Sequence, residues 1–142
     1  MTNSLAPFFD FRVSGEDDEV FPHRKPHPYI YEYTLEQYGN TSATNEGIGV
    51  WCHVGDCLAN DVGASTACGA QAIWMCMEDD EDAAASRLVD TKKIPEWSTA
   101  TTSELEQRAK QIEEGKQAVA AKIDKLSQLP EAIALILEKV YS

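Results

Sequence analysis

Three residues in two short segments have the types and the spacing that phosphate chemistry needs. Asp56 follows the apolar run at residues 50–54 and a glycine, and Asp61 comes five positions later. Carboxylates at the end of a strand suit a hard, oxygen-preferring cation such as Mg²⁺. Lys25, in a separate loop, carries an ammonium that can neutralise a phosphate or a carboxylate. An Asp–Asp–Lys set around Mg²⁺ stabilises phosphoryl transfer electrostatically.

Two other groups of residues suggest metal ligands but fit such sites less well. Cys52, His53 and Cys57 resemble one half of a zinc site, yet no second close pair completes it. Buried cysteines that behave as small hydrophobes are the simpler interpretation. The acidic run at residues 78–82 offers oxygen ligands for calcium, but such runs are usually solvated surface.

The elements that must position Asp56 and Asp61 follow an alternating pattern. Apolar runs predict strands and polar–apolar stretches predict helices, the latter ended by Gly39 and Gly69. The expected strands are residues 8–13, 50–54 and 70–77, and the expected helices are residues 28–38 and 59–68. This rhythm is typical of an α/β fold with a parallel sheet. Ligands bind beyond the carboxyl ends of such strands, which is where Asp56 stands.

The C-terminal half has a different pattern. Leu105, Ile112, Val119 and Leu126 repeat every seven residues and predict an amphipathic helix over residues 103–126, weakened by Gly115. Packing of this helix onto its own domain and a helix–helix contact between chains both remain open. A further, almost entirely apolar helix begins at Pro130, and we expect it to be buried.

Length, charge and cysteine content exclude several classes of protein. The 142 residues suffice for one ordinary domain, and a net charge of -12 disfavours nucleic acid and anionic membrane surfaces as partners. No apolar run approaches the ~20 residues of a membrane helix. The four cysteines have no disulfide-framework spacing, and the first residues have no export signal. We therefore expect reduced thiols and a cytoplasmic protein.

Two segments resemble motifs of the haloacid dehalogenase-like hydrolases. Residues 25–31, Lys-Pro-His-Pro-Tyr-Ile-Tyr, are similar to the third motif of that family. Residues 53–64 contain Gly-Asp, then Asn-Asp, then Gly-Ala, and resemble the fourth motif. The resemblance implies a partial doubly wound (Rossmann-like) parallel sheet with a helical C-terminal extension. It also implies that Lys25 holds the nucleophile and the phosphate and that Asp56 and Asp61 serve a Mg²⁺ site.

One feature of that family has no counterpart in this sequence. Its nucleophile is the first aspartate of an Asp-x-Asp motif upstream of the lysine, whereas Asp10-Phe11-Arg12 has an arginine at the acid/base position. Without the nucleophile no aspartyl-phosphate forms. We therefore expect this chain to be the C-terminal half of a hydrolase and inactive by itself. The strand at residues 50–54 should then have an unpaired edge.

The resemblance divides the chain into three segments. Residues 1–77 are expected to form a partial core, residues 78–121 an inserted acidic loop and amphipathic helix, and residues 122–142 the closing segment and last helix of the core. The expected activity of the parent protein is Mg²⁺-dependent hydrolysis of a phosphate ester on a small phosphorylated metabolite.

Two other functions stay open. A non-catalytic interaction module would dock a partner, or a second copy, through the 103–126 helix and the exposed sheet edge. A nucleotide-binding module is suggested by Gly47 and Gly49, but this glycine pattern has cysteine at its third position and precedes a strand instead of following one.

Overall fold

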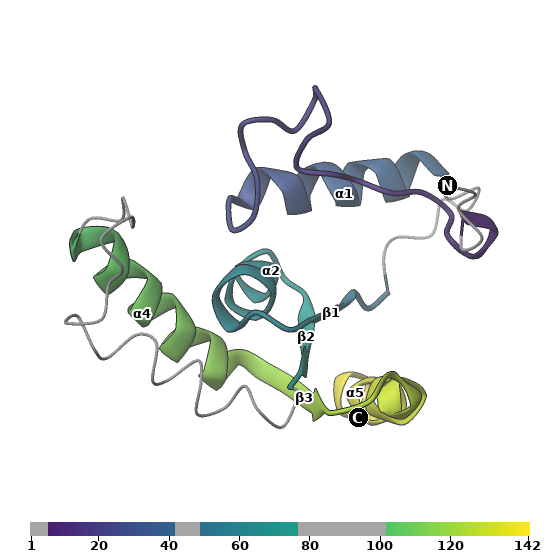
Figure 1. The fold of residues 1–142 in the computed structure, drawn as a ribbon. Helices are drawn as coiled ribbons and strands as arrows, with labels where there is room; N and C mark the ends of the chain where they lie inside the picture. The colour runs from purple at the N-terminus through teal and green to yellow at the C-terminus, as the bar shows by residue number, and fades with distance from the viewer. Residues whose placement is uncertain (1–5, 42–48, 77–101) are drawn as a thin grey trace. The chain divides into compact units, whose positions relative to one another are not determined.

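A computed structural model describes residues 6–41, 49–76 and 102–142 (Figure 1). The chain divides by its internal contacts into two compact units, Met1–Gly49 and Val50–Ser142. These are called unit 1 and unit 2. The expected boundaries at residues 77/78 and 121/122 remain predictions, although a strand of unit 2 crosses the second of them.

Unit 1 contains a short 3-10 turn, η1 (Ala6–Phe8), and one long helix, α1 (Pro28–Thr41). The strand predicted over residues 8–13 is wrong: this segment has no strand structure, and Phe8 and Phe9 are 80% and 65% exposed. A strand is stabilised by pairing with neighbouring strands, and no described segment pairs with residues 8–13. The aromatic composition of this segment is therefore not sufficient to make it a strand.

Helix α1 begins at the predicted residue and ends later than predicted. Pro28 occupies its first position, and His27 Nδ1 accepts a hydrogen bond from the Tyr29 amide at 3.2 Å. Gly39 was expected to end the helix. Among the described glycines only Gly69 has a positive φ, so Gly39 keeps a helical backbone and α1 continues to Thr41.

Unit 2 is built on a three-stranded parallel sheet, which confirms the predicted α/β class. Its strands are β1 (Cys52–Gly55), β2 (Gln71–Met75) and β3 (Val119–Ile123), in the order β1-β2-β3. Gly55 pairs with Trp74, and Trp74 pairs with Lys122. In the part of the chain that the structure describes, β1 pairs only with β2 and forms one edge of the sheet.

The helical segment after β1 confirms the prediction for residues 59–68. It starts as a π-helical stretch, η2 (Leu58–Gly63), and continues as the short helix α2 (Ala64–Ala67). Gly69, at φ 98°, then reverses the chain into β2. Only glycine adopts this backbone conformation without strain.

The predicted helix over residues 103–126 is wrong in its last third. Helix α4 spans Thr102–Ala118, and the chain then enters β3 at Val119. Val119 fits the seven-residue repeat because it is apolar, but it is apolar because it packs against the core as the first residue of β3. Pairing with β2 outweighed the helical pattern, as tertiary contacts often do for short apolar segments.

Two apolar layers cover the two faces of the sheet. The first joins η2 and α4 to one face, and the second joins α5 (Leu129–Tyr141) to the other, with the 3-10 turn η4 (Leu126–Gln128) before it. Neighbouring residues of β2 alternate between the layers, as a strand requires. The buried members are Leu58, Val62, Ala72, Trp74 and Cys76 in the first layer and Ile73, Ile123, Ala132 and Ile136 in the second.

Helix α5 is only partly buried, so the expectation of complete burial is wrong. Ala132 and Ile136 contact the sheet, whereas the opposite side and the C-terminal turns of the helix are open. A single helix packed on one face of a sheet can bury only one stripe of its surface. The exposed apolar side chains are Leu135, Leu137, Val140 and Tyr141.

Glycines allow α4 to pack tightly on η2. A Cβ at Gly115 would overlap the Leu58 carbonyl oxygen and lie 3.0 Å from its carbon. A Cβ at Gly63 would lie 3.2 Å from the Gln111 oxygen. Gly115 was expected only to weaken the helix, but it is the residue that lets the two backbones meet. The helix therefore packs onto its own domain, which is one of the two possibilities left open above.

Candidate functional site

The structure brings two of the three predicted site residues together. Asp56 directly follows β1, and Asp61 lies in η2, so both stand at the carboxyl end of the edge strand. Lys25 lies in the loop before α1, in unit 1, and its predicted role stays a prediction. The site that can be described geometrically is therefore the loop from Gly55 to Asp61, which we call the β1 loop.

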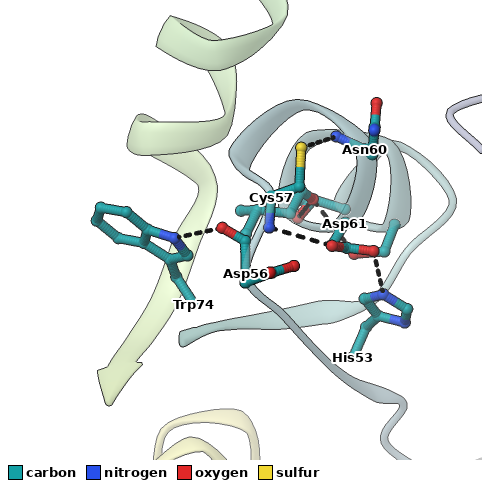
Figure 2. Close-up of polar contacts among 9 residues, drawn as sticks. His53, Asp56, Cys57, Asn60, Asp61 and Trp74 are labelled. Carbon is teal, nitrogen blue, oxygen red and sulfur yellow. Dashed lines mark hydrogen bonds and ion pairs between the residues drawn. The ribbon is translucent and has the colours of Figure 1, made fainter. Parts of the chain in front are cut away.

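The Asp61 carboxylate holds the β1 loop in shape (Figure 2). Its Oδ2 accepts a hydrogen bond from the Cys57 amide at 3.1 Å, and its Oδ1 lies 3.6 Å from His53 Nε2. The Asp61 amide in turn donates to the Cys57 carbonyl at 2.8 Å. With 8% of the residue exposed, Asp61 is a buried carboxylate that depends on these contacts.

Gly55 makes room for that carboxylate. A Cβ at position 55 would overlap the Cβ of Asp61 and lie 2.8 Å from its Oδ2. No other residue type fits this position without moving Asp61. The Gly-Asp pair of the sequence motif thus has a steric reason: the glycine accommodates the second aspartate of the motif, Asp61, and not only the turn itself.

Asp56 has the opposite character. Its side chain is exposed, while its backbone is fixed because the Trp74 indole donates to the Asp56 carbonyl at 3.0 Å. The Lys122 ammonium lies 5.1 Å from the centre of the Trp74 ring on the neighbouring strand. Asp56 is thus an accessible carboxylate on a rigid backbone, which is the property a ligand-binding residue needs.

The cysteine and histidine of the possible zinc half-site have other roles in the structure. Cys57 Sγ accepts a hydrogen bond from the Asn60 amide at 3.4 Å and caps η2, while His53 lies next to Asp61. Burial raises the pKa of the Cys52 thiol. No disulfide joins the four cysteines. The contacts of Cys57 and His53 stabilise the β1 loop.

Asp124 is a further carboxylate at the carboxyl end of the parallel strands, on the opposite outer strand, and the sequence argument did not select it. It directly follows β3 as Asp56 directly follows β1, and both strands run parallel. Its amide donates to Gln128 Oε1 at 2.9 Å, while its Oδ1 is buried without a hydrogen-bond partner in the described residues. The signal was an Asp after an apolar run, and it was missed because residues 119–123 were assigned to a helix.

The described residues do not by themselves make up a magnesium site. Within residues 6–41, 49–76 and 102–142, no three His, Cys, Asp or Glu side chains gather as metal ligands do. Mg²⁺ requires near-octahedral oxygen coordination, whereas Asp61 Oδ2 accepts from the Cys57 amide and its Oδ1 lies 3.6 Å from His53 Nε2. The acidic run at residues 78–82, considered above for calcium, lies outside the described residues.

Comparisons with other proteins return no relative for this chain. No protein-family model, no curated protein and no solved structure matches it. Among the described helices, none has the length and apolar character that a bilayer crossing requires.

Proposed function

We propose that unit 2 is part of the core of a haloacid dehalogenase-like hydrolase, with hydrolysis of a small phosphate ester as the activity of the parent protein. The β1 loop carries this proposal, because an exposed Asp56 and a buried Asp61 follow a parallel strand in the order of the fourth motif. The position of β1 at the sheet edge also agrees with a core in which a further strand belongs beside it.

The residues of the β1 loop have separate tasks in this proposal. Asp56 supplies the accessible carboxylate near the reacting phosphate. Asp61 holds the loop through the Cys57 amide, and Gly55 leaves space for it. Lys25 is assigned by resemblance to the nucleophile and the phosphate. Because no Asp-x-Asp pair precedes Lys25, we expect no aspartyl-phosphate and no turnover from this chain alone.

The decisive test of the proposal is the source transcript upstream of the codon for Met1. An in-frame apolar strand that ends in Asp-x-Asp would support a hydrolase core, whereas a stop codon close upstream would contradict it. Purified residues 1–142 should not hydrolyse p-nitrophenyl phosphate in the presence of Mg²⁺. Turnover that disappears in Asp56→Asn would show that the chain contains a nucleophile after all.

The second candidate is an interaction module without catalytic activity. It is favoured by the exposed apolar side chains on α5 and by the edge of β1, which pairs only with β2 among the described residues. The docking surface cannot be a continuous 103–126 helix, because this segment is α4 followed by β3. Charged substitutions at Val119 or Ile123 would unfold the sheet and are unsuitable as tests, since Ile123 is only 4% exposed.

A test of this second candidate uses the exposed side of α5. Light scattering of the wild-type chain should give a mass above the 15.7 kDa monomer if α5 joins two copies. Leu137→Glu should then restore the monomer, and Gln107→Glu on α4, with the same change of charge at an exposed position, should not. A monomeric wild-type protein would contradict self-association.

A further inference from the structure

Four ring side chains in unit 1 form a continuous row at the start of α1. The rings of His23 and His27 have centroids 4.4 Å apart. His23 meets the edge of Tyr29 at 5.5 Å, and Tyr29 stacks on Tyr33 at 6.2 Å. We call these four residues the ring row. Both histidines are exposed, and Tyr29 is 37% exposed, so the row lies on the surface of the unit.

Negative charges act on Tyr33, at one end of the ring row. Partial burial raises the pKa of the Tyr33 phenol, and the negative charges of Glu19, Asp17 and Glu36 raise it further, as does Tyr29. Such an effect requires charges near the phenol, because water and salt screen more distant ones. At this end of the ring row, the aromatic ring of Tyr33 therefore lies within the electrostatic influence of these carboxylates.

Two of these carboxylates have no cation beside them in the structure. Glu19 and Glu36 are exposed, and among the described residues neither forms an ion pair. Asp17 accepts a hydrogen bond from the Ser14 amide at 2.7 Å, which fixes the loop that carries Glu19. Asp17 and the loop that carries Glu19 are thus held in place, and the exposed carboxylates of Glu19 and Glu36 can meet a cation from solvent.

Unit 1 already binds one guanidinium with the same combination of groups. Arg24 lies over the ring of Phe21, 5.1 Å from its centroid, and forms an ion pair with Glu16 at 2.8 Å. A ring face and a carboxylate together suit a guanidinium, which stacks on aromatic rings and donates to carboxylates in a plane. The ring row offers both kinds of group to a cation from outside.

We propose that the ring row, with Asp17, Glu19 and Glu36, is a docking surface for an arginine-containing segment of a partner protein. The net charge of -12 attracts basic segments and repels phosphate backbones, so the occupant is a protein and not a nucleic acid. A guanidinium fits better than an ammonium because it stacks on the rings. This docking does not depend on the hydrolase proposal, since it uses neither Asp56 nor Asp61.

Fluorescence anisotropy with a labelled hepta-arginine peptide tests the ring row directly. The wild-type chain should bind the peptide, and Tyr29→Leu should weaken binding by about two- to fivefold, the usual contribution of one exposed cation–ring contact. Tyr38→Leu is the matched control, because Tyr38 is an exposed tyrosine of α1 outside the row. It should leave binding unchanged.

The carboxylates and the kind of cation are tested in the same assay. Glu19→Gln should weaken binding and reduce its dependence on salt, whereas Glu32→Gln, at an exposed position of α1, should change it less. Hepta-lysine should bind more weakly than hepta-arginine. Equal affinities for the two peptides, or equal losses in Glu19→Gln and Glu32→Gln, would show attraction by net charge alone and would overturn the proposal.

A second measurement covers the case in which Tyr29→Leu does not fold. Hepta-arginine added to the wild-type chain should shift the ring proton resonances of His23, Tyr29 and Tyr33 in NMR spectra, and leave those of Tyr38 unchanged. Shifts at Tyr38 as large as those in the ring row, or no shifts in the row, would overturn the proposal.

Discussion

Asp61 occupies the space beside Gly55 in which any other residue would carry its Cβ. This relationship connects the first and last residues of the β1 loop, so the glycine at the end of β1 and the buried carboxylate in η2 form one structural unit. The exposed carboxylate of Asp56 stands between them on a backbone that Trp74 also holds. The loop is therefore rigid where it is buried and accessible at one side chain.

Gly55→Ala should destabilise unit 2 by about 1–3 kcal/mol, because the added methyl overlaps Asp61 in a closely packed loop. Urea unfolding followed by circular dichroism measures the change. In the Asp61→Gly background, Gly55→Ala should lower the stability of unit 2 by at least about 1 kcal/mol less than in the wild type. The Asp61 side-chain atoms that the new methyl would overlap are absent there. Additive effects of the two substitutions would contradict the steric explanation.

Asp61→Ala and Asp56→Ala should differ in their effect on stability. The first removes the acceptor of the Cys57 amide and the partner of His53, and should cost about 1–3 kcal/mol. The second removes an exposed side chain and keeps the carbonyl that accepts from Trp74, so its effect should stay within about 0.5 kcal/mol. Equal losses in urea unfolding would mean that Asp56 is also structural.

Two glycines in helices should respond to alanine with opposite signs. Gly115→Ala should destabilise unit 2 by about 1–3 kcal/mol, because the new Cβ meets the Leu58 carbonyl. Gly39→Ala has no atom within 4 Å of the new Cβ and should stabilise α1 by up to about 1 kcal/mol. Thermal unfolding of both variants gives the comparison, and a stabilised Gly115→Ala would refute the close contact between α4 and η2.

The Cys52 thiol should react slowly with iodoacetamide in the folded chain. Burial raises its pKa above the ordinary value of 9.0, so less thiolate is present at a given alkaline pH than in the unfolded chain. The folded state thus holds this proton more tightly, and the associated stability is lost as pH rises through the folded pKa. Peptide mass spectrometry of protein alkylated with and without urea measures the difference; equal rates would rule out the shift.

Local sequence signals predicted an element correctly where the tertiary contacts favour the same structure. Pro28 at the start of α1, Gly69 at the turn before β2, and the apolar runs of β1 and β2 each have a local physical reason. The failures have a common origin in tertiary contacts. The aromatic segment after Phe8 has no pairing partner among the described residues, and Val119 gained one in β2.

The sequence by itself determined the parallel α/β class and the positions of Asp56 and Asp61 after a strand, because period, glycines and strand ends are local properties. Only the tertiary structure decided that Asp61 is buried against Gly55 while Asp56 is exposed. It also decided that Gly115 marks a backbone contact. These outcomes depend on which surfaces pack together, and that information is shared between segments distant in the chain.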